Sequence, residues 1–239
     1  NKIVGQKSGK EAMLRGMSMF WSDATGIQYY NKEVIKWAVN NLKIDVFRYA
    51  MGVQYYDSDG GTSNKLDDNY SYMKAGDTQK SKIDQMVEAA IENDIYIIID
   101  WHSHRAYDGS EKSLSKSFFS EMATKYKNVP NIIWEVFNEP TGSYNDWGQI
   151  KSYANDVIGG IRSAGNKNLA LVGTPNWSQM GQCGGVSGEN IGYVFHFYAG
   201  THSVGQYGGA VTSCKNGGNA VFITEWGTTT ADGKGDANT

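Results

Sequence analysis

The sequence predicts a parallel (β/α)8 barrel, the TIM-barrel fold, whose eighth βα unit is missing from this chain. Short apolar, β-branched runs alternate with helical patterns from one end to the other, and no Pro- or Ser-rich linker separates two halves. The 239 residues also suit one barrel of this kind. We therefore expect residues 1–239 to form a single barrel domain, cut short after its seventh strand.

The expected strands are apolar runs, several of them apolar on consecutive residues, as in a sheet buried on both faces. They are Leu14–Phe20, Ile44–Ala50, Ile95–Trp101, Ile132–Asn138, Leu169–Gly173, Tyr193–Tyr198 and Val221–Trp226. Helical patterns lie between them at Lys32–Leu42, Thr78–Asn93, Lys112–Lys127 and Asp146–Ile161. Asp146 is the expected N-cap of the last helix, and Gly165 is its expected stop.

The sequence has one strand fewer than a closed barrel needs. A closed barrel of this type has eight strands, and seven runs are present here. The polar, glycine-rich stretch 228–236 that follows the seventh run is typical of a loop. Because an open sheet would leave two unpaired strand edges, we expect the eighth unit to have been removed or to reside in a second polypeptide.

Composition excludes two classes of partner. Lys plus Arg number 22 and Asp plus Glu number 25, so the net charge is −3, which argues against nucleic acid. No run approaches the roughly 18 apolar residues that a membrane span requires. We therefore expect a protein that binds neither nucleic acid nor membranes.

Cys183 and Cys214 are the only cysteines, too few for a disulfide scaffold or a Cys-based zinc cluster. Their spacing is compatible with one disulfide and equally with two free thiols. A disulfide would place the chain outside the reducing cytosol. The chain starts at Asn1 without an initiator Met, so we expect that any signal peptide has been removed or was left out.

Polar residues follow the apolar part of nearly every expected strand, where barrels carry their catalytic groups. They are Arg48, His102, Asn138, Glu139, His196, Tyr198 and Glu225. A lone buried charge is more often a structural ion pair, because an unpaired one is costly. Their recurrence at equivalent strand ends indicates that they converge on one site, with independent ion pairs as the alternative.

Two carboxylates from different strands that face one pocket are the minimum for glycoside hydrolysis. Glu139 and Glu225 meet this condition. Strand alternation predicts that Glu225 shares the inward face with Ile223. Asn138 and Glu139 are adjacent, so both reach the pocket only if the strand bends as it ends, and Pro140 is consistent with such an ending.

The segments around these residues resemble the acid/base and nucleophile signatures of glycoside hydrolase family 5 endoglucanases, the bacterial cellulase type. The strongest matches are IWEVFNEP at 133–140 and FITEWG at 222–227. Further matches occur along the chain in the same order as in the family, at residues 16–21, 46–50, 99–104, 173–178 and 196–198. The resemblance extends from about Gly16 to Gly227.

The resemblance implies a secreted, retaining endo-β-1,4-glucanase that hydrolyses cellulose or related β-glucans and needs no cofactor or metal. Glu139 would be the acid/base and Glu225 the nucleophile. Arg48 and Tyr198 would hold Glu225 ionised, because charge-assisted donors favour a carboxylate. Since Glu139 must be protonated before it acts, its pKa should be higher than that of Glu225.

The resemblance also assigns residues that bind the sugar. Asn138 would bind the 2-hydroxyl, a contact that strengthens in the transition state. His102 and His196 would line the subsite at the cleaved bond, and His196 would also orient the acid/base. Trp21 and Trp177 would be flat platforms for pyranose rings. The tryptophan that the family carries on strand eight has no counterpart in this chain.

Several alternatives stay open at this point. The substrate could instead be mannan or a mixed-linkage glucan, and the missing strand is compatible with a carbohydrate-binding barrel without catalysis. His102 and His104 have the spacing of two metal ligands on one strand, although His104 is expected to be an ordinary loop residue. The acidic segment 57–68 has the composition of a calcium loop.

Overall fold

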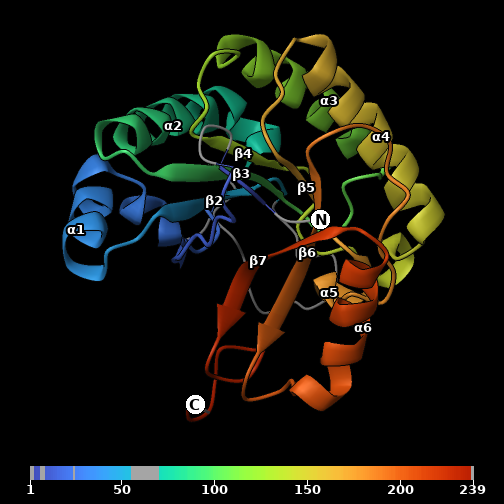
Figure 1. Cartoon of the computed structure of the whole chain (residues 1–239). Helices are drawn as coiled ribbons and strands as arrows, with labels where there is room; N and C mark the ends of the chain where they lie inside the picture. Colours follow the sequence, from blue (N-terminus) through green and yellow to red (C-terminus); the bar gives the residue numbers. More distant parts are fainter. Residues whose placement is uncertain (1–2, 6–8, 24, 55–69, 238–239) are drawn as a thin grey trace.

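The computed structural model describes residues 3–5, 9–23, 25–54 and 70–237, which form one parallel sheet surrounded by helices (Figure 1). The strands are β1 (Gly16–Ser18), β2 (Val46–Gly52), β3 (Tyr96–His102), β4 (Ile132–Glu135), β5 (Ala170–Val172), β6 (Ile191–Tyr198) and β7 (Ala220–Gly227). They lie side by side in chain order, and each neighbouring pair is parallel. The predicted barrel architecture with its missing eighth unit is confirmed.

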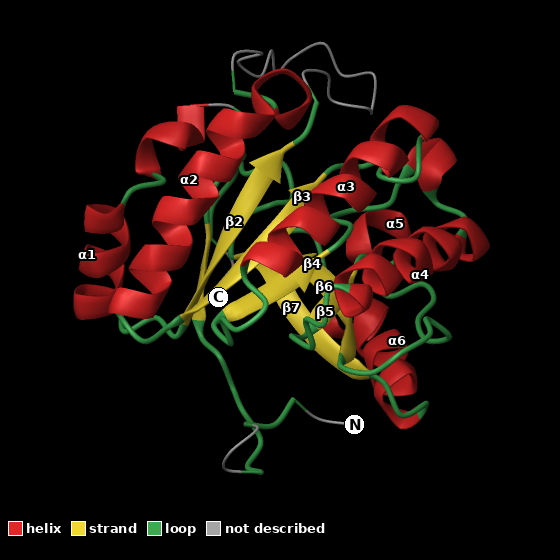
Figure 2. Ribbon diagram, turned by 90° about the horizontal axis from the view of Figure 1, so that it is seen from above, coloured by secondary structure: helices red, strands yellow, loops and turns green. Residues whose placement is uncertain are grey.

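The helices cover the outside of the sheet (Figure 2). They are α1 (Lys32–Leu42), α2 (Tyr72–Glu92), α3 (Gly109–Lys125), α4 (Trp147–Ser163), α5 (Pro175–Ser178) and α6 (Val204–Asn216), with 3-10 turns at Thr25–Tyr29 and Gly142–Tyr144. Asp146 caps α4 as predicted, because its Oδ1 accepts a hydrogen bond from Gln149 N at 2.8 Å. Gly165 follows α4 with a φ of 79°, the left-handed conformation that favours glycine.

Helix α6 is absent from the predicted elements, because its glycines and polar residues conceal any apolar period. A capping box begins it: the Gln206 side chain accepts from Ser203 N at 2.8 Å. Cys214 on this helix forms a disulfide with Cys183, which lies between α5 and β6. The structure thus selects the disulfide from the two options that the spacing left open.

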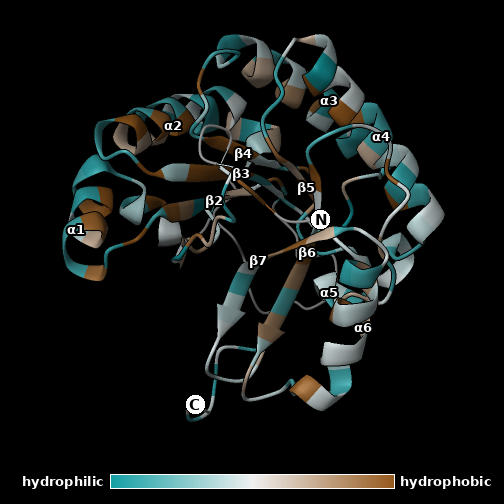
Figure 3. Cartoon of the chain, viewed as in Figure 1, coloured by the Kyte–Doolittle hydropathy of each residue, from teal (hydrophilic) through white to brown (hydrophobic). Residues whose placement is uncertain are grey.

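Apolar side chains fill the inside of the barrel below the strand ends. One layer is contributed by successive strands from β2 to β6 and consists of Val46, Ile98, Ile133, Leu171 and Val194. Phe222 of β7 packs against this layer. The outward faces of the strands form a larger cluster with the helices, whose surfaces mix hydrophobic and hydrophilic residues (Figure 3). Residues two positions beyond the inner layer on β2, β3 and β6 therefore point into the site.

Strand β7 does not follow the predicted alternation. Phe195 of β6 pairs with Ile223, and His196 pairs with Glu225, so Thr224 is an extra residue in a β-bulge. Thr224 is buried, whereas Ile223 is 45% exposed. The prediction that Ile223 shares the inward face with Glu225 is therefore wrong, because the bulge allows both Thr224 and Glu225 to reach the interior.

The barrel is nearly closed, but no pairing in the described part of the chain joins β7 to β1. An apolar groove of about 670 Å³ lies between these two strands. Met17, Ile223 and Trp226 line it and are exposed, Trp226 by 58%. This groove is where an eighth strand of a closed barrel would lie.

Two sequence predictions concern other parts of the molecule. Every helix in the described part of the chain is too short or too polar to cross a membrane. The acidic segment 57–68, considered for calcium, lies outside the described residues.

Candidate active site

The polar strand ends meet around the buried guanidinium of Arg48 on β2. Its Nε donates to Glu135 at 2.9 Å, Nη1 donates to Glu225 at 2.8 Å, and Nη2 donates to Asn138 at 2.6 Å. Nη2 also lies 2.9 Å from the Asp100 carboxylate. Burial lowers the pKa of Arg48, but these carboxylates outweigh burial and raise it. Arg48 therefore stays cationic and joins four strand ends into one site.

Glu225, near the end of β7, has both carboxyl oxygens occupied. Arg48 donates to Oε2, and the hydroxyl of Tyr198 donates to Oε1 at 2.5 Å. Burial and the charge of Glu139 raise the pKa of Glu225, but the charges of His196 and Arg48 prevail and lower it. Ionised Glu225 is therefore the stable form, held by two donors.

The segment that carries Asn138 and Glu139 is irregular, because β4 ends at Glu135. The predicted strand to Asn138 is too long: β5 contributes only three residues, so pairing stops early. Outside the strand, adjacent side chains need not point to opposite faces. Asn138 can therefore reach Arg48 while Glu139 reaches His196.

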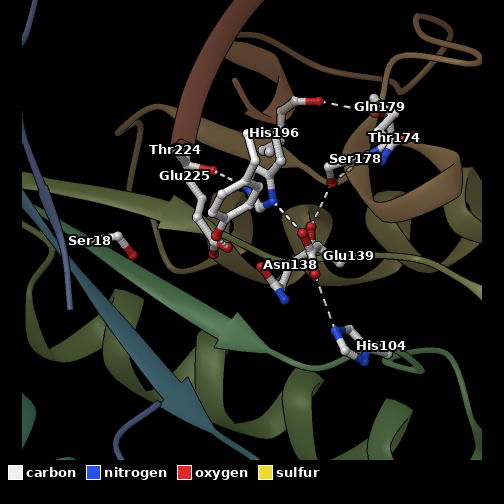
Figure 4. A network of polar contacts seen from close by, with 12 residues as sticks. Ser18, His104, Asn138, Glu139, Thr174, Ser178, Gln179, His196, Thr224 and Glu225 are labelled. Carbon is white, nitrogen blue, oxygen red and sulfur yellow. Dashed lines mark hydrogen bonds and ion pairs between the residues drawn. The ribbon is translucent and has the colours of Figure 1, made fainter. Parts of the chain in front are cut away.

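Glu139 lies between two imidazoles (Figure 4). His196 Nδ1 is 2.8 Å from Oε1, and His104 Nε2 is 3.2 Å from Oε2. Burial raises the pKa of Glu139, but the hydrogen bonds of His104 and His196 outweigh it and hold the pKa far below its usual range. The sequence placed His196 beside Glu139, and His104 is a second imidazole contact that it did not predict.

The partner of Glu139 has the opposite shift. Burial lowers the pKa of His196, but the hydrogen bond of Glu139 and the charge of Glu225 raise it above its ordinary value. A proton shared by the two groups is therefore favoured on the imidazole over the Glu139 carboxylate. The two groups form one proton-holding pair.

The two glutamates are close to each other. One oxygen of Glu139, one oxygen of Glu225 and one ring nitrogen of His196 all lie within 4.8 Å of one another. Carboxyl groups about 5 Å apart are typical of retaining glycosidases, whereas inverting enzymes need roughly 6.5 to 9.5 Å. The site therefore has room for direct attack by one carboxylate.

These three ligand atoms also form the single metal-compatible group found among the described residues. The two histidines that were considered as an alternative metal pair face different carboxylates. His102 Nδ1 faces Asp100 at 2.6 Å, whereas His104 Nε2 faces Glu139. The prediction that His104 is an ordinary loop residue is also wrong, because it contacts the acid/base candidate.

His102 and Trp21 form a wall beside the carboxylates. Their rings meet edge to face with centroids 4.2 Å apart. Burial and the charge of Arg48 lower the pKa of His102 to about 3, so the imidazole is neutral. Burial also raises the pKa of Asp100 to about 7, although Arg48 opposes it.

Trp177 is 44% exposed on a turn with unusual backbone geometry. Asn176, Trp177 and Ser178 have φ values of 57°, 53° and 56°, a left-handed conformation that costs non-glycine residues energy. Trp177 N donates to Pro140 O at 3.1 Å, and Ser178 Oγ donates to the carbonyl of Asn138 at 2.6 Å. These bonds tie the exposed ring to the segment that carries Glu139.

Sequence reasoning gave no role in the site to Asp100, Glu135 and Thr224, and it considered His104 only as a possible metal ligand. Alternation from Ile133 would have placed Glu135 inward. For Thr224 and His104 the sequence offers no comparable signal, because a bulge positions one and a loop positions the other.

The fold and the site define a β/α-barrel protein with paired carboxylates at the carboxyl ends of its strands, the arrangement that barrel glycosidases use. The family model "Cellulase (glycosyl hydrolase family 5)" matches residues 6–239, and the chain belongs to this family.

Two relatives show what share of a longer protein the chain matches. Endoglucanase Z of Dickeya dadantii (strain 3937) is 39% identical over 244 residues, which cover 100% of this chain and 53% of that protein. The endoglucanase of Clostridium saccharobutylicum is 36% identical over 98% of this chain and 50% of its own. The chain thus spans about half the length of these curated relatives.

Solved structures are similar to this chain over nearly its whole length. A structure from Cytophaga hutchinsonii is 41% identical with a TM-score of 0.86, covering 100% of this chain and 72% of its own. The catalytic domain of Thermobifida fusca endoglucanase Cel5A (E5) is 26% identical with a TM-score of 0.82, covering 99% and 76%. A variant of the latter in complex with cellotetraose has a TM-score of 0.81 at 26% identity, covering 96% and 73%.

Proposed function

We propose that this chain carries the catalytic residues of a secreted, retaining endo-β-1,4-glucanase that hydrolyses internal bonds of cellulose or related β-glucans. One observation carries the proposal: Glu139 and Glu225 approach within 4.8 Å at the carboxyl end of the barrel. The names of the relatives, which are endoglucanases, and the cellotetraose bound to the Thermobifida fusca variant support a β-1,4-glucan substrate.

Glu225 is the nucleophile of this reaction. Its carboxylate attacks the anomeric carbon while Glu139 gives a proton to the leaving oxygen, so a glycosyl-enzyme forms. Water then attacks the same carbon, Glu139 takes a proton from it, and the Glu225 ester breaks. Arg48 and Tyr198 keep Glu225 ionised and aimed throughout.

Asn138 and the aromatic residues bind the sugar. The Asn138 amide nitrogen is buried and has no hydrogen-bond partner among the described residues, while its oxygen accepts from Arg48. A donor that is fixed by Arg48 and otherwise unsatisfied suits a sugar 2-hydroxyl. Trp177 is exposed enough to stack on a pyranose ring, and Trp21 with neutral His102 forms a polar and aromatic wall beside the carboxylates.

An eighth βα unit completes the enzyme that we propose, and a second polypeptide is one source for it. The groove between β1 and β7 supports this, because it is apolar and lined by exposed side chains of both strands. The Cys183–Cys214 disulfide supports secretion, since disulfides persist mainly in oxidising compartments.

The first test is Glu225→Gln, compared with Glu88→Gln on α2 as a control outside the site. Glu225→Gln should abolish turnover but leave cellotetraose binding largely intact, because the amide keeps the shape and loses the nucleophile. Loss of binding together with turnover would instead assign Glu225 a structural role. Unchanged turnover would refute the proposal.

The second test identifies the substrate and the contribution of the eighth unit. Initial rates are measured on carboxymethyl-cellulose, mannan and lichenan, with the chain alone and mixed with a peptide of a relative's eighth βα unit. We expect the highest rate on carboxymethyl-cellulose and an increase when the peptide is added. Faster hydrolysis of mannan would identify mannan as the substrate. Oligosaccharide that is bound but never cleaved would indicate a carbohydrate-binding protein without catalytic activity.

A further inference from the structure

Trp177 lies on a turn whose backbone conformation is unfavourable for most residues. Asn176, Trp177 and Ser178 all have the left-handed conformation, with φ between 53° and 57°. Asn adopts this conformation readily, but a residue such as Trp is strained in it. The Trp177 side chain is also 44% exposed, so packing does little to hold it. The turn therefore depends on hydrogen bonds from neighbouring segments.

These hydrogen bonds come from two places. On the inner side, Trp177 and Ser178 donate to carbonyl groups of the segment 138–140. On the outer side, the Asn145 side chain makes two bonds with Asn176. Asn176 N donates to Asn145 Oδ1 at 2.6 Å, and Asn145 Nδ2 donates to Asn176 Oδ1 at 2.6 Å. Asn145 thus holds the end of the turn that the 138–140 segment does not hold.

The chemistry of this pair fixes the orientation of both side-chain amides. A backbone N–H is a donor only, so the Asn145 atom that faces it must be the oxygen. The nitrogen of Asn145 then faces Asn176, whose side chain must present its own oxygen. Each contact therefore joins one donor to one acceptor. Neither amide can turn over alone without placing two like groups against each other.

Asn145 itself lies on a fixed support. It follows the 3-10 turn Gly142–Tyr144 and precedes Asp146, the N-cap of α4. The Tyr144 hydroxyl donates to Asp108 Oδ2 at 2.6 Å, which ties this connection to the start of α3. The pair therefore joins the left-handed turn to a connection whose backbone is held on both sides.

We propose that Asn145 is a positioning residue for substrate binding: its two bonds with Asn176 hold Trp177 in the orientation that receives a pyranose ring. This inference rests on the proposed glucanase function, in which Trp177 is a sugar platform. A chain whose turn has relaxed must re-form it before the sugar can stack. Its apparent affinity therefore falls in proportion to the fraction of molecules that keep the turn.

The bond-breaking step should keep its rate when the pair is lost. Glu139 is held by two imidazoles, and Glu225 is held by Arg48 and Tyr198. These contacts are independent of the two asparagines. A substrate that has reached the bound state is therefore cleaved as before, and the effect should fall on binding alone.

Removing the Asn145 amide tests this separation. Asn145→Leu keeps the size of the side chain and loses both bonds. We expect the Kd of cellotetraose to rise about 5- to 25-fold, since one net hydrogen bond corresponds to about fivefold. Calorimetry measures this Kd in the Glu225→Gln protein, the parent for all binding experiments, where turnover does not interfere. With Glu225 intact, KM should rise while kcat stays within about twofold.

Aspartate substitutions test the pairing itself. In Asn145→Asp, one carboxylate oxygen still accepts from Asn176 N, and the Asn176 amide can turn over to donate to the other. In Asn176→Asp, the new carboxylate accepts from Asn145 Nδ2. Both single variants should bind cellotetraose as the parent does. The double variant places two carboxylates against each other, so it should lose affinity as Asn145→Leu does.

The double variant should also have a pH signature that a merely structural role would not produce. Two carboxylates at hydrogen-bond distance resist ionising together, so the pKa of one of them rises above the ordinary value for aspartate. A protonated carboxyl donates to its neighbour and restores the pair. The affinity of the double variant should therefore increase as the pH falls from neutral to about 4. The parent, measured at the same pH values, is the reference.

A matched control adds the same two charges elsewhere. Asn40→Asp combined with Asn41→Asp, at exposed positions of α1, should leave binding unchanged. Unchanged affinity in Asn145→Leu, or single aspartate variants as weak as the double one, would overturn the role of Asn145. A parent that binds no cellotetraose, with or without the eighth-unit peptide, refutes the proposed function instead.

Hydrogen exchange keeps the inference testable without a ligand. The Asn176 and Trp177 amides donate to Asn145 Oδ1 and Pro140 O, so both should exchange slowly in the wild type. Asn145→Leu and the double aspartate variant should speed their exchange by about fivefold or more. Equal exchange in all variants would contradict the inference. A Trp177→Ala variant that binds cellotetraose normally would instead refute the platform role of Trp177.

Discussion

The two sides of the barrel differ in how their strands are covered. On the β2–β4 side, all seven residues of β2 are buried and the charged side chains Asp100 and Glu135 are paired with Arg48. On the β7 side, Ile223 and Trp226 are exposed along an open apolar groove. One side of the site is thus built into a closed core, and the other stands at the edge of the sheet.

Hydrogen bonds from two other strands hold Glu225 on this open side. Arg48 reaches it from β2, and Tyr198 reaches it from β6. Thr224 connects the same strand to Glu135 on β4. Two polar contacts, from Arg48 and to Glu135, therefore anchor the open side to the closed side, and the predictions below test how strong this dependence is.

Removing Arg48 should have the largest effect. Arg48→Met leaves Asp100 and Glu135 buried without their cation, and losing one partner of a buried pair typically costs about 3 to 5 kcal/mol. It should also abolish hydrolysis, because Glu225 loses its charged donor. Urea unfolding measures the stability, with Lys32→Met, an exposed ion-pair partner, as the control. Equal losses for the two variants would contradict the central role of Arg48.

Truncating one isoleucine on each side compares the two sides directly. Ile98→Ala in the inner layer should destabilise the chain by about 2 to 5 kcal/mol, because it leaves a cavity. Ile223→Ala at the open edge should cost about 1 kcal/mol or less, because this side chain is already half exposed. The cost of Ile223→Ala should rise when the eighth-unit peptide is added. A large cost without it would mean that the edge is already covered.

Removing the disulfide tests whether the open side depends on a covalent link. Cys183 and Cys214 are separated by 31 residues and join the β5–β6 connection to α6. The double change Cys183→Ser and Cys214→Ser should lower stability by about 2 to 4 kcal/mol. Thermal unfolding with and without reductant measures it, since only the wild type should respond to reductant. No response in the wild type would show that the bond contributes nothing.

The smallest expected effect is a shift in the pH dependence of kcat/KM, which reports on Glu225 and on the Glu139–His196 pair. The pKa of Glu225 is held below its ordinary 4.5, so activity should fall only when the pH drops below that value. The pKa of His196 is raised above its ordinary 6.5, so the pair keeps its proton until the pH rises beyond it. A profile whose alkaline limb lies below 6.5 would contradict proton storage on His196.

Much of the fold could be predicted from local patterns. Strand β3 (Tyr96–His102) and helix α1 (Lys32–Leu42) were predicted within one residue of their bounds, because apolar runs and helical periods are local signals. Helix α6 was not predicted, because it buries little and lacks an apolar period. Strand β4 was predicted three residues too long, because its end is set by the short neighbour β5.

The candidate site also has residues that the sequence predicts and contacts that only the structure reveals. Glu139 and Glu225 were predicted from residue type and strand position, and the structure brings them together. The contacts of His104 with Glu139 and of Thr224 with His196 join residues that lie 35 and 28 positions apart. The lowered pKa of Glu139 could not be predicted for the same reason, since it depends on the contacts of His104 and His196.

The sequence by itself determined the order of strands and helices and the chemical groups that end each strand, because both follow from short-range periodicity and residue type. Only the tertiary structure decided which side of β7 faces inward, which nitrogen of His196 faces Glu139, and that two cysteines meet. These outcomes depend on one bulge and on distances between distant segments. Such distances are set by the packing of the whole barrel, which no local pattern encodes.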